Sequence, residues 1–257
     1  MAFRQSTFDR RTLSGTFQAA IRLPIGVSEH FYSLQGEGPD TGCPAVFLRL
    51  KGCRLNCTFC DTAEVWKRGK TFSVEELAGI FRSNGYMNHL SNGAILILTG
   101  GSPLIQQTAL VPFLKLLRLQ MGTTFHVAVE TEGVIAPTKE LMLQISTWVV
   151  SLKLASSGEP KERRLIPETI RLHASMQAHG QVHFKFPVAD EQDFNEMLEL
   201  INQYEISPKR VWVMPVAATR AELQSSRVAE IAEWCKTHYL KFSTRLHIQL
   251  WDKATGV

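Results

Sequence analysis

The sequence GCRLNCTFCDT, residues 52–62, holds three of the five cysteines of the chain. Cys53, Cys57 and Cys60 follow the spacing Cys-x3-Cys-x2-Cys. Four-iron clusters are bound through cysteine thiolates, and three ligands instead of four leave one iron free to bind another molecule. The glycine before this run and the Asp-Thr pair after it favour a loop that can wrap its sulfurs around a compact cluster. The stretch therefore predicts an iron–sulfur site with chemistry at the open iron.

Other uses of these cysteines fit the pattern less well. A structural zinc site usually takes four protein ligands, and no second Cys-x2-Cys pair follows later in the chain. Disulfides between such close neighbours would be strained. We interpret the two remaining cysteines, Cys43 and Cys235, as small buried hydrophobic residues.

Length and composition indicate one globular domain. With 257 residues, 44% of them hydrophobic, the chain can bury a large core, and we expect an N-terminal arm over residues 1–25 and a single core domain over residues 26–257. The N-terminus lacks an apolar signal region, and no stretch approaches the roughly 20 apolar residues that span a bilayer. We therefore expect a cytoplasmic protein without a membrane partner. A net charge of +4 gives little support for a nucleic-acid partner.

Apolar runs of strand length alternate with amphipathic stretches of helix length, which is the pattern of βα units around a parallel sheet. The predicted strands are residues 44–51, 94–99, 125–130, 147–153, 182–188, 210–216 and 245–251. The predicted helices are residues 73–84, 108–120, 137–144, 166–179, 190–203 and 219–238. Ser73 and Glu76 form the sequence of a capping box at the start of the first helix. The pattern predicts an α/β fold, an incomplete TIM-like βα barrel with the cysteine loop after its first strand.

The residues that close the predicted strands are rich in functional groups. In parallel sheets the ligand site lies beyond the carboxyl ends of the strands. Those ends carry residues 99–103 (TGGSP), 130–133 (ETEG), 151–153 (SLK) and 214–216 (MPV). Each alone is also what an ordinary βα turn contains. Together with the cysteines they predict one shared site at this edge of the sheet.

The cysteines and these strand ends resemble the radical S-adenosylmethionine superfamily. A narrower resemblance comes from EHFYSLQGEGPDTGCPAVFLRLKGCRLNCTFCDT, residues 29–62, which is similar to the 7-carboxy-7-deazaguanine synthase family almost throughout. LTGGSPL, AVETEG, VVSLK, VWVMPV and RLHIQLWDKATGV continue the likeness in order. The resemblance implies a carbon–nitrogen lyase that converts 6-carboxy-5,6,7,8-tetrahydropterin to 7-carboxy-7-deazaguanine with loss of ammonia, in 7-deazapurine biosynthesis of the queuosine type. It also implies a 4Fe-4S cluster, S-adenosylmethionine, Mg²⁺, a flavodoxin-like electron donor and a homodimer.

The resemblance also implies roles for individual residues. The metal ligands are Cys53, Cys57 and Cys60 for the cluster and Thr62 for magnesium. The residues expected to bind substrate are Leu34, Gln35, Gly36, Arg49, Thr99 and Val257. The residues expected to bind S-adenosylmethionine are Phe59, Cys60, Asp61, Gly101, Ser151, Leu152, Lys153, Met214, Pro215, Val216 and Ala217. Loss of ammonia needs a base, and Glu37, Glu130 and His247 are unranked candidates.

Two departures from the family pattern leave alternatives open. Ser102 stands where the superfamily often has glutamate, whose carboxylate accepts from the methionyl ammonium, so either binding is weaker or another acid serves. Leu152 replaces a proline, which relaxes one backbone constraint. The alternatives are a glycyl-radical activating enzyme, which would need a large docking face for a protein substrate, and a cluster-binding relative without turnover.

Overall fold

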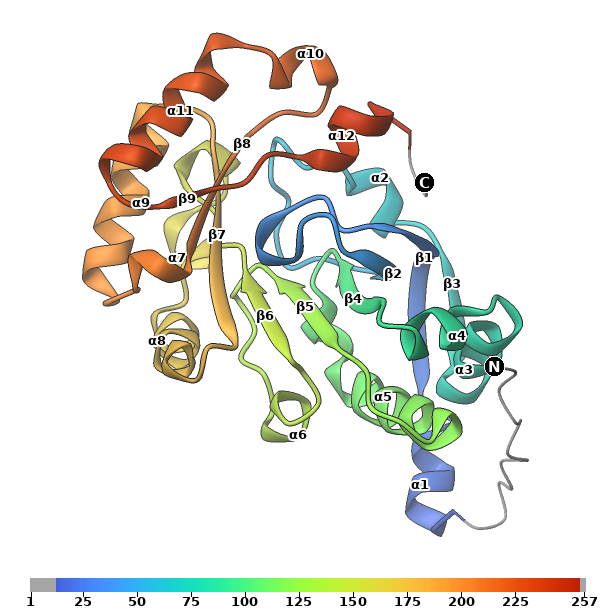
Figure 1. The fold of residues 1–257 in the computed structure, drawn as a ribbon. Coiled ribbons are helices and arrows are strands. Elements are labelled where there is room, and N and C mark those ends of the chain that lie inside the picture. The colour runs from blue at the N-terminus through green and yellow to red at the C-terminus, as the bar shows by residue number, and fades with distance from the viewer. Residues whose placement is uncertain (1–12, 255–257) are drawn as a thin grey trace.

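The computed structural model describes residues 13–254 of the chain. Within this range nine strands form one sheet in the order β3-β1-β2-β4-β5-β6-β7-β8-β9. The strands are β1 (Pro24–Leu34), β2 (Pro44–Leu50), β3 (Lys70–Ser73), β4 (Ile95–Gly100), β5 (Val127–Thr131), β6 (Thr147–Val150), β7 (Val182–Val188), β8 (Val211–Pro215) and β9 (Lys241–Phe242). From β2 to the β9 edge all neighbours are parallel, whereas β1 pairs antiparallel with both β2 and β3. The sheet is curved and open (Figure 1), which confirms the predicted incomplete βα barrel.

Twelve α-helices accompany the sheet in the described chain, and most of them connect the parallel strands and cover its outer face (Figure 1). They are α1 (Gly15–Ala20), α2 (Ala63–Trp66), α3 (Val74–Ser83), α4 (Tyr86–Ser91), α5 (Gln107–Met121), α6 (Lys139–Met142), α7 (Lys161–Arg164), α8 (Pro167–Met176), α9 (Glu191–Gln203), α10 (Arg220–Leu223), α11 (Ser226–Thr237) and α12 (Leu246–Trp251). The capping box predicted for α3 is present, because Ser73 Oγ accepts from the Glu76 N–H and the Glu76 carboxylate accepts from the Ser73 N–H. The helix predicted over residues 219–238 is divided into α10 and α11.

The main core lies between the sheet and these helices. The strand β4 is buried along its apolar residues, as expected for a parallel strand covered on both faces. Trp148, Phe113 and Phe184 are the kind of large side chain that fills this core, and all three are fully buried. Burying side chains of this size contributes about 2–3 kcal/mol each, so the core fixes the strand ends on which the site is built.

The strand predicted over residues 245–251 is wrong, because this segment forms α12. Alternating apolar residues suggested a strand, but six residues are too few to separate a period of two from a helical turn. In the structure Ile248 is buried against Ala217 and Leu223, while Leu250 is half exposed. The sheet ends instead at β9, which has only two residues and no apolar run to reveal it.

The N-terminal part of the described chain is packed on the core. Residues 1–12 of the expected arm lie outside the described residues, but α1 contacts α5, and Ile21 and Ile25 are fully buried. The strand β1 then runs for eleven residues antiparallel to β2, and its last residue, Leu34, pairs with Pro44 at the start of β2. Sequence periodicity did not predict β1, because its burial pattern is irregular and polar residues interrupt it.

Candidate active site

A cavity of about 710 Å³ opens at the carboxyl ends of the parallel strands. This volume lies in the upper half of the range of about 300–1,000 Å³ for small-molecule sites. Nearly all residues that the sequence assigned to the site line this cavity: Leu34, Gln35, Gly36, Glu37, Arg49, Cys53, Cys57, Phe59, Cys60, Asp61, Thr62, Thr99, Gly101, Glu130, Ser151, Lys153, Met214, Pro215, Val216, Ala217 and His247. The side chain of Leu152 is instead fully buried in the core, and Val257 lies outside the described residues.

Hydrogen bonds within the cysteine loop that follows β2, and one bond to another segment, hold this loop. The Leu55 N–H donates to Cys53 Sγ at 3.4 Å, and the Cys60 N–H donates to the Cys57 carbonyl at 3.2 Å. The Thr58 N–H donates to the carbonyl of Ser157, in the loop after β6, at 2.9 Å. The loop is therefore fixed to the neighbouring strand ends and presents three free thiols to the cavity.

The three cysteines fit a four-iron cluster better than a single ion. Within residues 13–254, no group of three or more His, Cys, Asp or Glu side chains converges closely enough to hold one metal ion. A cluster places each cysteine on a different iron, so its ligands need not converge on one point. The thiols also face a cavity with room for a further molecule. Cys53, Cys57 and Cys60 would therefore hold the cluster, and its fourth iron would face the cavity.

Two glycines allow chain segments to approach closely beside the cavity. A Cβ atom on Gly101 would lie 2.0 Å from the Gly52 carbonyl oxygen and 2.7 Å from Cys53 Cβ. A Cβ atom on Gly36 would lie 2.1 Å from His247 Nδ1. Gly101 thus lets the loop after β4 pack against the cysteine loop, and Gly36 lets α12 close over the end of β1 (Figure 1).

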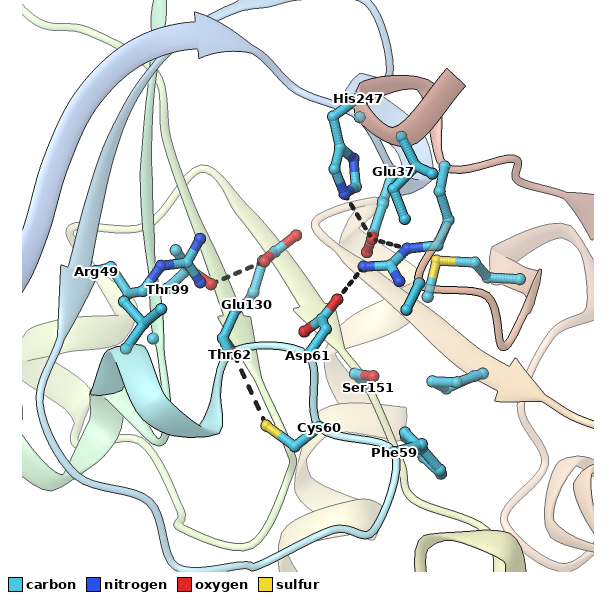
Figure 2. Close-up of a pocket in the computed structure, with 18 of the residues that line it drawn as sticks. Glu37, Arg49, Phe59, Cys60, Asp61, Thr62, Thr99, Glu130, Ser151 and His247 are labelled. Atoms are coloured by element: carbon cyan, nitrogen blue, oxygen red, sulfur yellow. Dashed lines mark hydrogen bonds and ion pairs between the residues drawn. The ribbon is translucent and has the colours of Figure 1, made fainter. Parts of the chain in front are cut away.

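A chain of ion pairs lines the cavity, and Glu37, Lys185 and Arg245 in it are largely buried. Lys185 Nζ lies 2.6 Å from Glu37 Oε2 and 3.5 Å from Glu130 Oε1, so one ammonium links two carboxylates. Arg245 donates to Glu37 Oε1 at 2.8 Å and is also paired with Asp61 in the cysteine loop. Figure 2 shows Glu37, Glu130 and Asp61 around the cavity, with Asp61 close to Cys60. The network joins the segment after β1, the strands β5 and β7, the cysteine loop and the residue before α12.

The charges rank the three candidate bases. Burial disfavours the ionised form of Glu37, but Lys185 and Arg245 outweigh it and hold the pKa of this carboxyl well below its usual range. A carboxylate held so strongly is a poor base. Burial lowers the pKa of His247, so its imidazole is neutral near pH 7 and has a free electron pair to accept a proton. The Glu130 side chain is more exposed than that of Glu37, at 20% against 11%. Glu130 and His247 therefore remain the candidate bases.

A second group of polar side chains surrounds Glu130. Gln35 Nε2 donates to Glu130 Oε1 at 3.2 Å. Thr99 Oγ1 donates to Glu130 Oε2 at 2.9 Å, as Figure 2 shows. On the neighbouring strand Arg49 donates through Nε to Glu29 Oε1 at 2.7 Å. This bond leaves the two terminal guanidinium nitrogens of Arg49 for an anionic ligand.

Sequence reasoning missed three charged residues of the site. Lys185 could have been predicted from the sequence, because it is the lone lysine of the apolar strand VHFKFPV. A lysine buried in such a strand must be paired with an acid or have a function. Arg245 was hidden by the wrong strand prediction. Glu132 was noted only as part of a strand end, and its proximity to Ser102, 30 residues away in the chain, is a property of the fold.

Known proteins resemble both the sequence and the structure. A family model described as "4Fe-4S single cluster domain" matches residues 34–165. The chain is 34% identical to a 7-carboxy-7-deazaguanine synthase from Hyperthermus butylicus, over 90% of this chain and 94% of the relative. It is 32% identical to the protein of the same name from Halobacterium salinarum, over 96% and 97% of the two chains. The fold matches the crystal structure of QueE from Escherichia coli with a TM-score of 0.66 and 23% identity, over 91% of this chain and 100% of that one.

Proposed function

The chain belongs to the 7-carboxy-7-deazaguanine synthase family, and we propose that it converts 6-carboxy-5,6,7,8-tetrahydropterin to 7-carboxy-7-deazaguanine with loss of ammonia. The observation that carries this proposal is the cavity itself. One continuous cavity joins the three cluster cysteines to the polar group around Glu130, so a radical source and a small polar substrate can be held together. The product would serve 7-deazapurine synthesis of the queuosine type.

The cofactors divide the cavity. When bound at Cys53, Cys57 and Cys60, the cluster and S-adenosylmethionine supply a carbon radical that abstracts hydrogen from the substrate. The chain contributes position and exclusion of water. Phe59 and Met214 offer apolar surface on the cysteine side of the cavity, and Ser151 and Lys153 offer polar groups there. We propose that these residues, which the family resemblance assigned to S-adenosylmethionine, would hold it beside the open iron.

The pterin would lie on the side of Glu130. The terminal nitrogens of Arg49 can take the substrate carboxylate as a bidentate pair. Gln35 and Thr99 already hold the Glu130 carboxylate and would fix it against the pterin ring. Glu130, which lies 3.5 Å from the Lys185 ammonium, would accept a proton as ammonia leaves, with neutral His247 as the second acceptor.

Four further features belong to the proposal. Thr62 would give Mg²⁺ a hydroxyl ligand, and substrate oxygens and water would complete a shell of hard donors. A flavodoxin-like protein would donate the electron, the enzyme would act as a homodimer, and it would work in the cytoplasm. Among residues 13–254, no helix combines the length and the apolar character that crossing a membrane requires.

The cavity also separates this proposal from its rivals. A glycyl-radical activating enzyme must admit a protein backbone, whereas here Glu37, Lys185 and Arg245 fill the side of the cavity near α12 with a buried ionic network. The rival without turnover rested on the missing carboxylate at Ser102. A buried carboxylate, that of Glu132, lies 2.7 Å from the Ser102 hydroxyl, so this rival loses its main support.

Anaerobic reconstitution tests the proposal. The protein would be loaded with iron and sulfide, then given S-adenosylmethionine, dithionite and carboxytetrahydropterin. We expect 5′-deoxyadenosine and 7-carboxy-7-deazaguanine to form together. Deoxyadenosine without the deazaguanine would refute the substrate, and absence of both from a protein with a loaded cluster would favour the non-catalytic alternative.

A further inference from the structure

Ser102 and Glu132 form a buried polar pair beside the cluster cysteines. The Ser102 hydroxyl donates to Glu132 Oε1 at 2.7 Å and lies 3.6 Å from Cys53 Sγ. It also accepts from the Arg54 N–H at 3.0 Å. Ser102 is fully buried, Glu132 is 5% exposed, and Glu132 lines the cavity together with Gly100 and Gly101. A carboxylate is thus held at the wall of the cavity, one serine away from a cluster ligand.

The Glu132 carboxylate is incompletely satisfied by the protein. An ionised carboxylate has about four acceptor positions on its two oxygens. Within the described residues these receive one short bond from Ser102, a contact from the Thr131 hydroxyl at 3.5 Å and the N–H of Glu132 itself. No lysine or arginine of residues 13–254 forms a salt bridge with it. Burial raises the pKa of this carboxyl and disfavours its ionised form, and the nearby Lys153 ammonium offsets this only in part, because it donates to the carbonyl and hydroxyl of Ser151. A cation that bonds directly to the carboxylate would stabilise its charge.

We propose that this partner is the methionyl ammonium of S-adenosylmethionine, and that Glu132 is the residue that accepts from it. The inference rests on the proposed function, which puts S-adenosylmethionine in this part of the cavity. The ligand carries an ammonium group on the amino acid end that binds the open iron. Glu132 offers a carboxylate beside Cys53 for that group to pair with, and a charge-assisted hydrogen bond there would satisfy both buried charges.

The serine then has a positioning role. Its single proton goes to Glu132, while its oxygen accepts from the backbone of the cysteine loop. This fixes the carboxylate relative to the loop that carries the cluster. The acid that the superfamily often places at position 102 is therefore replaced in space by an acid from the next strand end, and the hydroxyl at 102 orients it.

A pair of matched variants tests the assignment. Glu132→Gln and Glu130→Gln make the same change two residues apart on one strand end. Binding of S-adenosylmethionine to the reconstituted protein would be measured by anaerobic equilibrium dialysis, without pterin or reductant. We expect Glu132→Gln to weaken binding by about 10- to 100-fold, the range for losing a hydrogen bond between charged groups, and Glu130→Gln to change it by less than about threefold. Equal affinities in both variants would overturn the assignment.

A second ligand, which lacks the ammonium group, distinguishes pairing with the ammonium from a merely structural role of Glu132. 5′-Methylthioadenosine keeps the nucleoside and lacks the amino acid end. Glu132→Gln should leave its affinity unchanged within about twofold, so that the loss appears only with S-adenosylmethionine. An equal loss for both ligands would show that Glu132 supports the loop and does not pair with the ammonium.

An exchanged variant keeps the test decisive if Glu132→Gln fails to load iron. Ser102→Glu combined with Glu132→Ser returns a carboxylate to the same gap from the opposite side. With normal iron content, it should bind S-adenosylmethionine within about threefold of the unchanged protein. Failure to recover binding would contradict the proposal. Because no pterin is present, these results are independent of whether the unchanged protein forms 7-carboxy-7-deazaguanine.

Discussion

Gly101→Ala should disrupt the cluster site by steric overlap alone. The new methyl carbon would lie 2.0 Å from the Gly52 carbonyl oxygen and 2.7 Å from Cys53 Cβ. The first distance is more than about 1 Å below ordinary contact, and the neighbouring oxygen belongs to backbone that cannot rotate away. The Gly52 carbonyl also accepts from the Ser102 N–H at 2.8 Å, so moving it breaks this bond and displaces Cys53. We expect a loss of about 2–3 kcal/mol in the free energy of unfolding.

Two measurements check this expectation. Urea unfolding of the cluster-free protein gives the stability change, and iron and sulfide analysis after anaerobic reconstitution gives the effect on the cluster, which should fall by about half or more. The chain supplies a matched control in Gly79→Ala, because Gly79 is exposed within α3 and its added Cβ would meet no atom within 4 Å. That variant should gain about 0.5–1 kcal/mol. A Gly101→Ala protein with full iron content and stability within about 0.5 kcal/mol of the unchanged protein would refute the steric reasoning.

Three other changes have defined outcomes. Lys185→Met removes the ammonium that pairs with Glu37 and Glu130. It should lower the free energy of unfolding in urea by about 3 kcal/mol, and an unchanged midpoint would contradict this. Burial lowers the pKa of His173 to about 4. The stability that the neutral imidazole allows is therefore fully present above pH 6.5, its ordinary pKa, and is lost as the pH falls towards 4. Between about pH 7 and pH 5 the free energy of unfolding of the cluster-free protein should therefore fall by about 2 kcal/mol more than that of His173→Leu. Parallel pH profiles of the two proteins would contradict this prediction. Ser73→Ala removes the cap of α3 and should cost about 1 kcal/mol without altering product formation.

Local patterns predicted the parallel sheet and most of its helices. Strands such as β4 are continuous apolar runs, and α3 carries its capping box in its own sequence, so short-range information defines both. The errors fall where tertiary contacts decide. The α12 segment has strand-like alternation, yet Ile248 packs on Ala217 and Arg245 reaches Glu37 only when the segment turns as a helix.

The site also has a part that local sequence predicts and a part that only tertiary contacts determine. The cysteine spacing and the strand-end residues lie in short segments, so the sequence was enough to predict which of them share one edge of the sheet. The charge network was not predictable in this way, because Lys185 is separated by 148 residues from its nearest carboxylate, Glu37. Which base is free also depends on that network. Two cations bind Glu37, whereas the Glu130 carboxylate is more open.

The pair at positions 102 and 132 shows why a missing motif residue does not decide function by itself. A ligand ammonium needs a carboxylate at one place in the cavity, and the curved sheet brings two strand ends to that place. Either strand end can supply the acid, provided that the other supplies a small donor that leaves room for it. Ser102 meets this condition, since its hydroxyl is 2.7 Å from Glu132 and its side chain is small enough to be fully buried beside Cys53. On this reasoning Ser102→Ala should weaken binding of S-adenosylmethionine by only about 3- to 10-fold, less than Glu132→Gln, because it loosens the carboxylate without removing its charge. The same dialysis measurement compares the two, and a larger loss for Ser102→Ala than for Glu132→Gln would reverse the roles assigned to them.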